Sequence, residues 1–190
     1  MAVRNITVVG NRVLHQRTAG VEAITDDVRD LVRDMFDTMA AAHGVGLAAN
    51  QVGVPLRLFV YDCPDDQHVR HRGHVINPVL EVAPEPIGEP DPEEDLEGCL
   101  SVPGESFPTA RSHWARVRGI DLDGDPVELV GEGLFARMLQ HETDHLDGWL
   151  YLDRLAGIDK RDSKKAVLAR GWAKRKVLTW DPASQDADGV

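Results

Sequence analysis

The chain has 190 residues, of which 42% are apolar and 28% are charged, the ordinary composition of one soluble globular domain. Its 32 Asp and Glu residues exceed its 21 Lys and Arg residues, and the formal net charge of −11 disfavours a protein that binds nucleic acid, including any specific nucleic-acid sequence. No stretch approaches the roughly 20 apolar residues of a membrane helix, no signal peptide is recognisable, and two cysteines form no disulfide framework, so we expect a cytoplasmic protein without a membrane partner.

The first predicted element is an amphipathic helix from Thr25 to His43. Apolar residues recur there at i, i+3 and i+4 spacing, Thr25 is placed to cap the first turn, and Gly44 is placed to end the helix. Shorter runs of strand-forming residues follow at 57–62, 74–81, 115–122 and 126–130. The last two runs flank an Asp-Gly pair, which predicts a hairpin.

A second helix is predicted from Gly133 to His145, where the apolar spacing returns to the helical period and Gly148 is the stop. A third helix is predicted at about residues 160–176. Its expected inward face consists of Ala166, Val167, Leu168 and Trp172. Because few strands alternate with helices in the way that a parallel sheet requires, the pattern favours an α+β fold.

The composition predicts a single domain over residues 1–178 with two unusual segments. Residues 81–97 hold eight acids and four prolines in 17 positions, and we expect them to form a solvated surface loop. Residues 154–176 carry nine Lys and Arg against two Asp, which indicates either a solvated helix face or a cationic contact surface. Residues 179–190 are polar and are expected to be a flexible tail.

The second predicted helix carries a metal-binding pattern. His141 and His145 are spaced i, i+4, which places both imidazoles on one helical face within reach of one metal ion, and Glu142 is close enough to contact a water on that ion. The alternative is a pair of histidines that make ordinary hydrogen bonds on a helix flank. A catalytic centre of this type needs a third protein ligand and an open position.

Two sources of the third ligand are compatible with the sequence. His145 is the last histidine, so a downstream ligand would be an acid such as Asp147, Asp153 or Asp159, as in a zincin-like metallopeptidase that cleaves internal peptide bonds. Upstream, Cys99 directly follows the acidic segment, and a thiolate is a strong ligand for a borderline-soft divalent ion. Thiolate with two imidazoles suits Zn²⁺ and Fe²⁺ alike.

Three segments carry the sequence patterns that identify a family. Residues 44–51 match G-x-G-L-A-A-x-Q, residues 97–101 match E-G-C-L-S, and residues 140–146 match Q-H-E-x-D-H-L. In this order and spacing they resemble the peptide deformylase family. The resemblance implies a hydrolase that removes the N-formyl group from the initiator methionine of newly synthesised polypeptides, giving formate and a free amino terminus. It also implies antiparallel sheets packed around a central metal-binding helix, with an N-terminal helix and a C-terminal helix.

The resemblance also assigns roles at the centre. It implies that Cys99, His141 and His145 bind one divalent metal ion, with Fe²⁺ favoured and Zn²⁺, Ni²⁺ or Co²⁺ able to substitute. Glu142 is the natural group to transfer protons between water and the departing amine. The two donors that stabilise the oxyanion of the transition state would be the Gln51 side-chain amide and the Leu100 backbone N–H. Without the rest of the motif, Gln51 would be predicted to be an ordinary surface residue at the end of a strand.

The substrate is expected to lie along the first motif. By the resemblance, an extended N-formyl-methionyl nascent peptide pairs there as an added strand, and glycines let the two backbones approach. The expected contacts are Gly44, Val45, Gly46, Leu134 and Met138. The last two and Val45 are candidates for the wall of the methionine pocket, with a place in the ordinary core as the alternative. Gly44 also has a simpler role as a helix cap.

Three further expectations concern the surroundings of the site. Arg137 stands where an apolar pocket residue would be simpler, so its aliphatic stem is expected at the rim, and Ser106 provides no basic group after the second motif. Glu97 and Arg111 form either a pair that steadies the cysteine loop or a surface ion pair without a role. A ribosome has a polyanionic RNA surface, so residues 154–176 are a possible contact with it.

Two remaining groups are not expected to bind metal. Cys63 has no partner motif and is expected to be a partly buried free thiol. His68, His71 and His74 have i, i+3 spacing, but the arginines beside them disfavour a cation.

Overall fold

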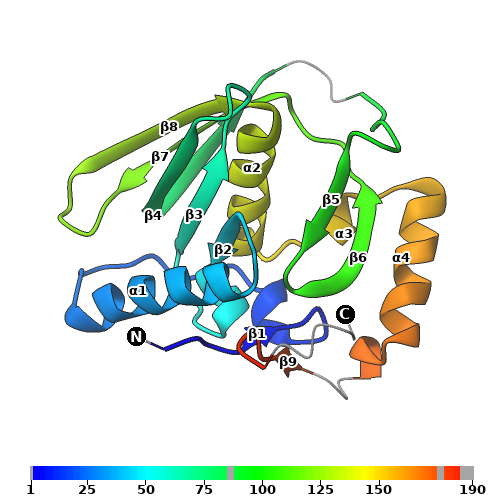
Figure 1. Cartoon of the computed structure of the whole chain (residues 1–190), viewed down its shortest axis with the longest axis horizontal. Coiled ribbons are helices and arrows are strands. Elements are labelled where there is room, and N and C mark those ends of the chain that lie inside the picture. Colours follow the sequence, from blue (N-terminus) through cyan, green and yellow to red (C-terminus); the bar gives the residue numbers. More distant parts are fainter. Residues whose placement is uncertain (1, 85–87, 175–177, 185–190) are drawn as a thin grey trace.

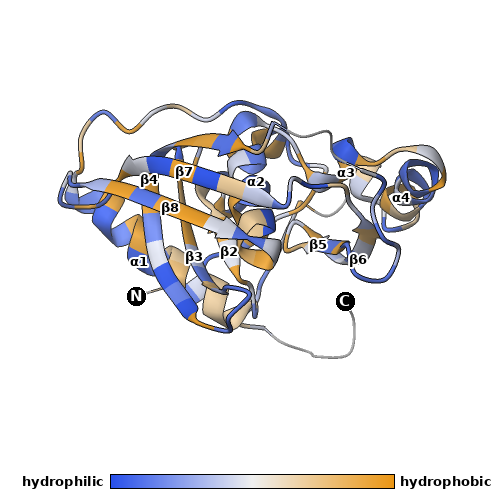
Figure 2. Ribbon diagram, turned by 90° about the horizontal axis from the view of Figure 1, so that it is seen from above, coloured by the Kyte–Doolittle hydropathy of each residue, from blue (hydrophilic) through white to orange (hydrophobic). Residues whose placement is uncertain are grey.

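The computed structural model describes residues 2–84, 88–174 and 178–184. A five-stranded antiparallel sheet forms one half of the molecule, and a small two-stranded sheet with the C-terminal helices forms the other (Figure 1). The long helix α2 (Gly133–Asp147) lies between the two halves, as Figure 2 also shows from above. Mixed helices and antiparallel sheets around a central helix confirm the α+β fold.

The large sheet has the strand order β2-β3-β4-β7-β8, and every pair is antiparallel. Its strands are β2 (Gly46–Ala48), β3 (Leu58–Pro64), β4 (Arg70–Val82), β7 (Trp114–Ile120) and β8 (Pro126–Glu132). The predicted hairpin is confirmed, since Ile120 pairs with Pro126 across the turn that contains Gly124 at φ 87°. Strand β4 begins earlier than predicted. Its first residues are polar and so gave no strand pattern in the sequence, but they pair with β3, as His71 does with Cys63.

The first helix, α1 (Asp26–Ala41), packs its apolar face against β2 and β3. The Thr25 hydroxyl accepts the Val28 N–H at 3.4 Å, which confirms the predicted cap. The helix ends slightly earlier than predicted. The left-handed residue after its last turn is His43, at φ 54°, and not Gly44.

Nearly all of α2 is buried, because it contacts the large sheet on one side and the strand that carries Glu97 and Cys99 on the other. Its sheet-facing residues include Phe135, Ala136 and Leu139, which pack with β3 and β7 side chains. Gly148 adopts φ 82° and its N–H bonds back to the last turn, so the predicted stop is confirmed. The polar residues of the second half of α2 are therefore held at fixed positions in the interior.

The second half of the molecule begins with β5 (Leu96–Cys99) and β6 (Val102–Pro108), which form a two-stranded antiparallel sheet. The acidic segment is consequently shorter than predicted. Residues 81–82 belong to β4, and Glu97, on β5, is only 4% exposed. Residues 85–87 lie outside the described part of the chain.

The C-terminal region differs most from the sequence prediction. Helices α3 (Tyr151–Arg154) and α4 (Gly157–Ala169) are followed by a 3-10 turn, η3 (Trp172–Lys174), so the predicted helix at 160–176 is wrong at both ends. Gly171, at φ 76°, breaks the helix. Leu168 is exposed, Trp172 is buried beyond the end of α4, and Ala166 and Val167 are half-buried. None of the described helices is long and apolar enough to cross a membrane.

The first two residues of the segment predicted to be a flexible tail form a strand. Thr179 and Trp180 make up β9, which pairs antiparallel with β1 (Ile6–Thr7) near the N-terminus. A composition argument missed it because two residues carry the pairing, and their partner lies more than 170 residues away in the sequence. The rest of the predicted tail is described only as far as residue 184.

Candidate metal centre

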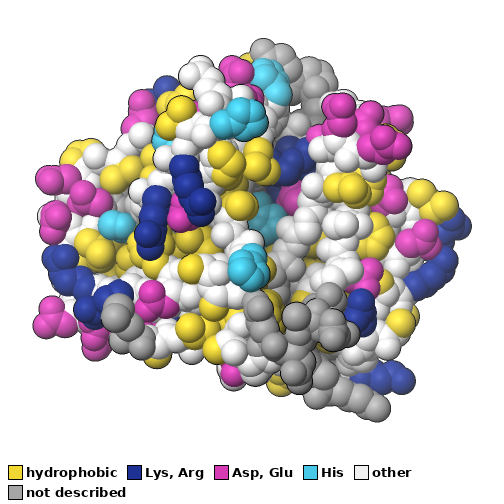
Figure 3. Space-filling view, in the orientation of Figure 1, with side chains coloured by type: hydrophobic (Ala, Val, Ile, Leu, Met, Phe, Trp, Pro, Cys, Tyr) yellow, Lys and Arg dark blue, Asp and Glu magenta, His cyan; other side chains and the backbone are white. Residues whose placement is uncertain are grey.

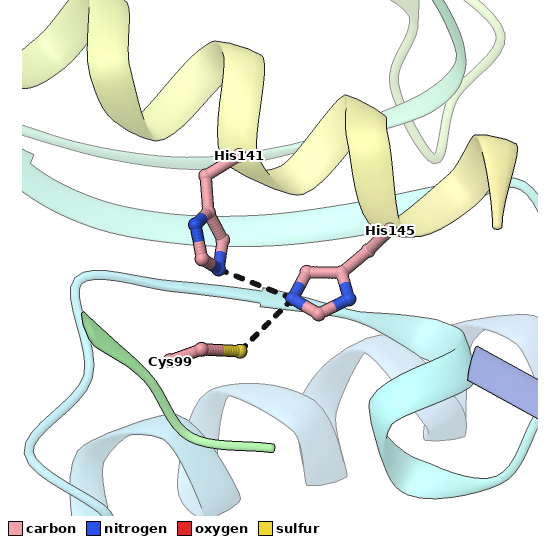
Figure 4. A group of neighbouring side chains, drawn as sticks. All are labelled: Cys99, His141 and His145. Atoms are coloured by element: carbon pink, nitrogen blue, oxygen red, sulfur yellow. Dashed lines mark hydrogen bonds between the residues drawn. The ribbon is translucent and has the colours of Figure 1, made fainter. Parts of the chain in front are cut away.

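Cys99, His141 and His145 converge between α2 and the end of β5 (Figure 4). The Cys99 sulfur lies 3.2 Å from Nε2 of His145, and that nitrogen lies 3.1 Å from Nε2 of His141. All three potential ligand atoms lie within 4.8 Å of one another. In the described residues, no other cluster of His, Cys, Asp and Glu has this arrangement.

The donor set fits a divalent ion with three protein ligands and one open position. Nδ1 of His141 lies 2.6 Å from Oε1 of Glu97, so Nε2 is the ring nitrogen presented to the cluster. Burial and the neighbouring His141 hold the pKa of His145 well below its ordinary value, which keeps this ring neutral, as a ligand must be. Burial opposes a charge on His141, but the neighbouring Cys99 sulfur and Glu97 carboxylate raise the pKa of His141. The negative charge of these two groups also makes the centre favourable for a cation.

Glu97 is the central acid of a buried ion-pair network next to the centre, where it contacts Arg111, Arg137 and His141. Arg111 binds its two carboxylate oxygens at 2.6 and 3.0 Å, and both side chains are 4% exposed. Burial alone would raise the pKa of Glu97, but Arg111 and His141 hold it well below its ordinary range. Arg111 also contacts Asp144 at 2.5 Å. The pair therefore supports His141, and the alternative of a surface pair without a role is wrong.

Arg137 belongs to the same network and is not simply a rim residue. Its guanidinium donates to Glu97 at 3.0 Å and to the Thr109 carbonyl at 2.7 Å, and it also pairs with Asp95. Sequence reasoning missed these contacts, although one signal was present: an arginine one helical turn before His141 needs an acidic partner if it is buried.

Glu142 lies beside the centre in an almost fully buried position. Burial raises the pKa of its carboxyl group to about 7, and its Oε2 has no hydrogen-bond partner among the described residues. The other oxygen, Oε1, lies against Gly46, where any side chain would overlap it. A carboxyl group with this pKa exchanges protons readily near neutral pH.

Gln51 points its amide at the centre from the 3-10 turn η2 (Ala49–Val52), which follows β2. Its Oε1 accepts the Ala48 N–H at 2.8 Å, which fixes the amide orientation. Its Nε2 donates toward the Cys99 sulfur at 3.6 Å and the Ser101 hydroxyl at 3.2 Å. The Leu100 N–H donates to no group in the part of the chain that the structure describes. Two N–H donors are thus available beside the centre.

A cavity of about 650 Å³ opens onto the centre, and Figure 3 shows this face of the molecule hollowed between its two halves. Residues of the first motif, of the cysteine loop and of α2 from Leu134 to Glu142 line it. Val45 and Leu134 are 41% and 47% exposed, so they are available as a wall, whereas Met138 lines the cavity but belongs mainly to the core. Ser106 also lines the cavity, and so does Trp180, which the sequence analysis did not place at the site.

The other cysteine and two of the other histidines have their own surroundings away from the centre. Cys63 is a free thiol as expected but is fully buried, and burial raises its pKa to about 12. His71 contacts Asp65, and His74 accepts the Leu122 N–H, so these two side chains do not converge on a metal site.

These features are typical of a metal-dependent hydrolase: a Cys-His-His cluster lies at an open cavity, beside a glutamate that can be protonated near neutral pH and two N–H donors. The polypeptide deformylase family model matches residues 3–161. The peptide deformylase of Mycolicibacterium vanbaalenii is 58% identical, with 99% of this chain and 98% of that protein covered. That of Mycolicibacterium smegmatis is 59% identical, with 96% and 95% covered.

Solved structures agree with the sequence relatives. The peptide deformylase of Ehrlichia chaffeensis in complex with actinonin matches with a TM-score of 0.79 at 34% identity, covering 93% of this chain and 99% of that one. That of Legionella pneumophila matches with a TM-score of 0.75 at 34% identity over the same shares. The chain belongs to the peptide deformylase family, and its activity is the hydrolytic removal of the N-formyl group from nascent peptides. The zincin-like alternative is not supported.

Proposed function

We propose that Cys99, His141 and His145 hold one divalent metal ion and that Glu142, Gln51 and Leu100 carry out deformylation beside it. The observation that carries this proposal is the convergence of one sulfur and two imidazole nitrogens within 4.8 Å, next to a buried glutamate. Thiolate with two imidazoles suits Zn²⁺ and Fe²⁺ alike, and the family resemblance favours Fe²⁺, with Zn²⁺, Ni²⁺ or Co²⁺ as substitutes. When bound, the ion supplies Lewis-acid chemistry that makes a water molecule a better nucleophile at neutral pH.

Glu142 takes the proton of the attacking water at its carboxylate and returns a proton to the departing amine nitrogen. Its pKa of about 7 suits both transfers, because the group is neither a strong acid nor a strong base at the working pH. Burial at 3% exposure keeps bulk water away from the carboxylate. Glu142 is not a metal ligand in this proposal.

Gln51 and Leu100 stabilise the negative charge that develops on the formyl oxygen. The Gln51 amide is already oriented by the Ala48 N–H, and its Nε2 makes only long contacts, at 3.2 Å to the Ser101 hydroxyl and 3.6 Å to the Cys99 sulfur. The Leu100 N–H has no partner in the described structure. Preorganised donors of this kind contribute about 10² to 10³ in rate.

The peptide substrate is proposed to lie along β2, which is an edge strand of the large sheet and so has one unpaired side. Gly44, Val45 and Gly46 follow this edge, and Leu134 and Met138 complete the wall for the methionine side chain. The formyl carbon carries only hydrogen, so a close-fitting site excludes a larger acyl group. Formyl-Met peptides are expected to react and acetyl-Met peptides are not.

The direct test is metal content together with formate release from formyl-Met-Ala. Cys99→Ala, His141→Ala and His145→Ala are each expected to empty the site, as measured by atomic emission, and to abolish formate release. Full metal occupancy in Cys99→Ala would contradict the proposed ligand set and point to an acidic third ligand. Comparable turnover of formyl-Met-Ala and acetyl-Met-Ala by the parent protein would contradict the close-fitting site.

We also propose that the chain forms a single catalytic domain and that it works in the cytoplasm. The domain, which the composition placed at residues 1–178, extends at least to Trp180 because β9 pairs with β1. Its partner beyond the nascent peptide is the ribosome, contacted through the basic segment 154–176. Figure 3 shows Lys and Arg side chains gathered at the α4 end of the molecule, and residues 175–176 lie outside the described part.

Ribosome binding has a test that leaves the catalytic centre untouched. The reversals Lys160→Glu, Lys164→Glu and Lys165→Glu on α4 are expected to reduce co-sedimentation with ribosomes at low salt. Hydrolysis of formyl-Met-Ala should be nearly unchanged, because these side chains are outside the cavity. Co-sedimentation that survives the charge reversal would show that the basic segment is only a solvated surface.

A further inference from the structure

One peptide unit joins the C-terminal strand to the metal-binding cysteine. The indole Nε1 of Trp180 donates to the Leu100 carbonyl oxygen at 2.8 Å. The Ser101 N–H, at the other end of the same peptide unit, lies 3.3 Å from the Cys99 sulfur. Because a trans peptide unit is planar and its C=O and N–H point in opposite directions, a bond that fixes the carbonyl also fixes the N–H.

Trp180 is itself held firmly by the N-terminal strand. It pairs with Ile6 in the β1–β9 ladder, and the Val8 N–H donates to the Leu178 carbonyl at 3.0 Å. The next residue, Val9, donates its N–H to the Ser101 carbonyl at 2.9 Å. The N-terminal segment therefore ties the C-terminal strand and the cysteine loop together.

The packing agrees with the hydrogen bonds. Trp180 and Cys99 both pack against one apolar cluster of Val8, Val102, Tyr151 and Trp172. This cluster is separate from the two clusters that flank the large sheet. A short C-terminal strand thus forms part of the support of the metal-binding loop.

We propose that Trp180 is a positioning residue for the metal centre: it holds the Ser101 N–H on the Cys99 sulfur. This inference rests on the proposed function in one respect, namely that Cys99 is a metal ligand. An N–H donor stabilises negative charge on a thiolate, and a peptide whose carbonyl accepts a hydrogen bond is a stronger donor at its N–H. Losing such a contact around a metal ligand typically costs about 10- to 100-fold in metal affinity.

The test compares Trp180→Phe with Trp172→Phe. Phenylalanine keeps most of the apolar surface at either position but cannot donate a hydrogen bond. Trp172 is buried in the same cluster and the same C-terminal region, but it makes no hydrogen bond to Leu100, so it controls for lost packing. Activity is not the readout, because Trp180 also lines the cavity.

Each protein is loaded with Co²⁺, and the sulfur-to-cobalt charge-transfer band and the metal affinity against a chelator are measured. In Trp180→Phe the band is expected to move to longer wavelength, because a thiolate with a weaker hydrogen bond is easier to oxidise. The metal affinity should fall about 10-fold or more. In Trp172→Phe only the melting temperature should fall.

A second measurement uses the parent protein, in case Trp180→Phe does not fold. With ¹⁵N-labelled tryptophan, the Trp180 indole resonance should shift when Zn²⁺ is added, and the Trp172 resonance should stay in place. An unchanged charge-transfer band and metal affinity in Trp180→Phe would overturn this inference. A Trp180 indole resonance that does not shift when Zn²⁺ is added would overturn it as well. Absence of a charge-transfer band in the parent protein would instead contradict Cys99 as a ligand.

Discussion

The carboxylate of Glu142 lies directly against Gly46, so closely that a methyl group at Gly46 would overlap Oε1. Gly46 is the first residue of β2, and Glu142 is on the facing side of α2. The resemblance explained the glycine by the approach of a substrate backbone. The structure adds a reason within the protein itself, since only glycine leaves room for the carboxyl group.

Gly46→Ala is therefore expected to displace the Glu142 carboxylate and to lower kcat for formyl-Met-Ala by about 100-fold, the scale on which a misplaced group costs rate. The metal content should remain that of the parent protein. Gly44→Ala is the matched comparison, because its methyl group would meet the flexible end of the Leu100 side chain, at 2.8 Å, and not Glu142. Since Gly44 is on the proposed substrate edge, its variant is expected to raise KM and to leave kcat nearly unchanged. Equal losses in the two variants would contradict a specific role for the Gly46–Glu142 contact.

Glu142→Gln is a second test of the same site, and it preserves the size of the side chain. The variant should bind metal normally but lose about 10² to 10⁴ in kcat, because glutamine cannot carry the proton from water to amine. Atomic emission and formate release measured on one preparation separate the two effects. Normal kcat at normal metal content would remove Glu142 from the mechanism.

The sequence predicted the helical part of the site well and the supporting part poorly, for a physical reason. His141, Glu142 and His145 are placed by the period of one helix, so their spacing alone brings them together. Glu97 was assigned to the edge of a solvated loop because its neighbours are acids and prolines. Its burial depends on Arg111 and Arg137, which come from other segments. The sequence offered Arg111 as a partner of Glu97 but could not show that the pair is buried.

Trp180 shows the same limit in a different way. Its local sequence is polar and rich in turn-forming residues, which is typical of a chain end. Its position comes from pairing with Ile6 and from the Leu100 carbonyl, and both partners are distant in the sequence. Long-range pairing of two-residue strands has no periodicity that a sequence reading can detect.

The two arginines behind the centre should differ in their effect on stability. Arg111→Met removes the two-point partner of the buried Glu97 and one of the two arginine partners of Asp144, which keeps Arg154, and we expect the free energy of unfolding to fall by about 3–5 kcal/mol. Arg137→Met should cost less, about 1.5–3 kcal/mol, because Glu97 keeps Arg111 and Asp95 is partly exposed.

Urea denaturation of the parent protein and both variants, all loaded with Zn²⁺, provides the comparison. The essential result is the order of the free energies of unfolding, which should be lowest for Arg111→Met, higher for Arg137→Met and highest for the parent. The absolute values depend on how far each site relaxes. A larger loss in Arg137→Met would show that Arg137, and not Arg111, is the main counter-charge of Glu97.

The last prediction concerns pH and a histidine remote from the centre. His74, half-buried on β4, accepts the Leu122 N–H at 3.0 Å through Nε2, which requires the neutral ring. Burial lowers its pKa in the folded protein, against the opposing effect of Asp121 and Asp123. Histidine in the unfolded chain titrates near about 6.5, so the unfolded state takes up a proton first as the pH falls. The contribution of His74 to stability is therefore complete above that pH and is lost below it.

His74→Gln isolates this contribution, because a glutamine amide oxygen can accept the same N–H and does not titrate in this range. The free energy of unfolding of parent and variant, measured in urea at a series of pH values between about 7.5 and 5.5, should converge toward the acidic end. Since both proteins carry the same metal centre and the same acids, every other titration cancels in the difference. A difference that stays constant with pH, or one that grows in favour of the parent protein as the pH falls, would show that the Leu122 contact does not require the neutral ring of His74.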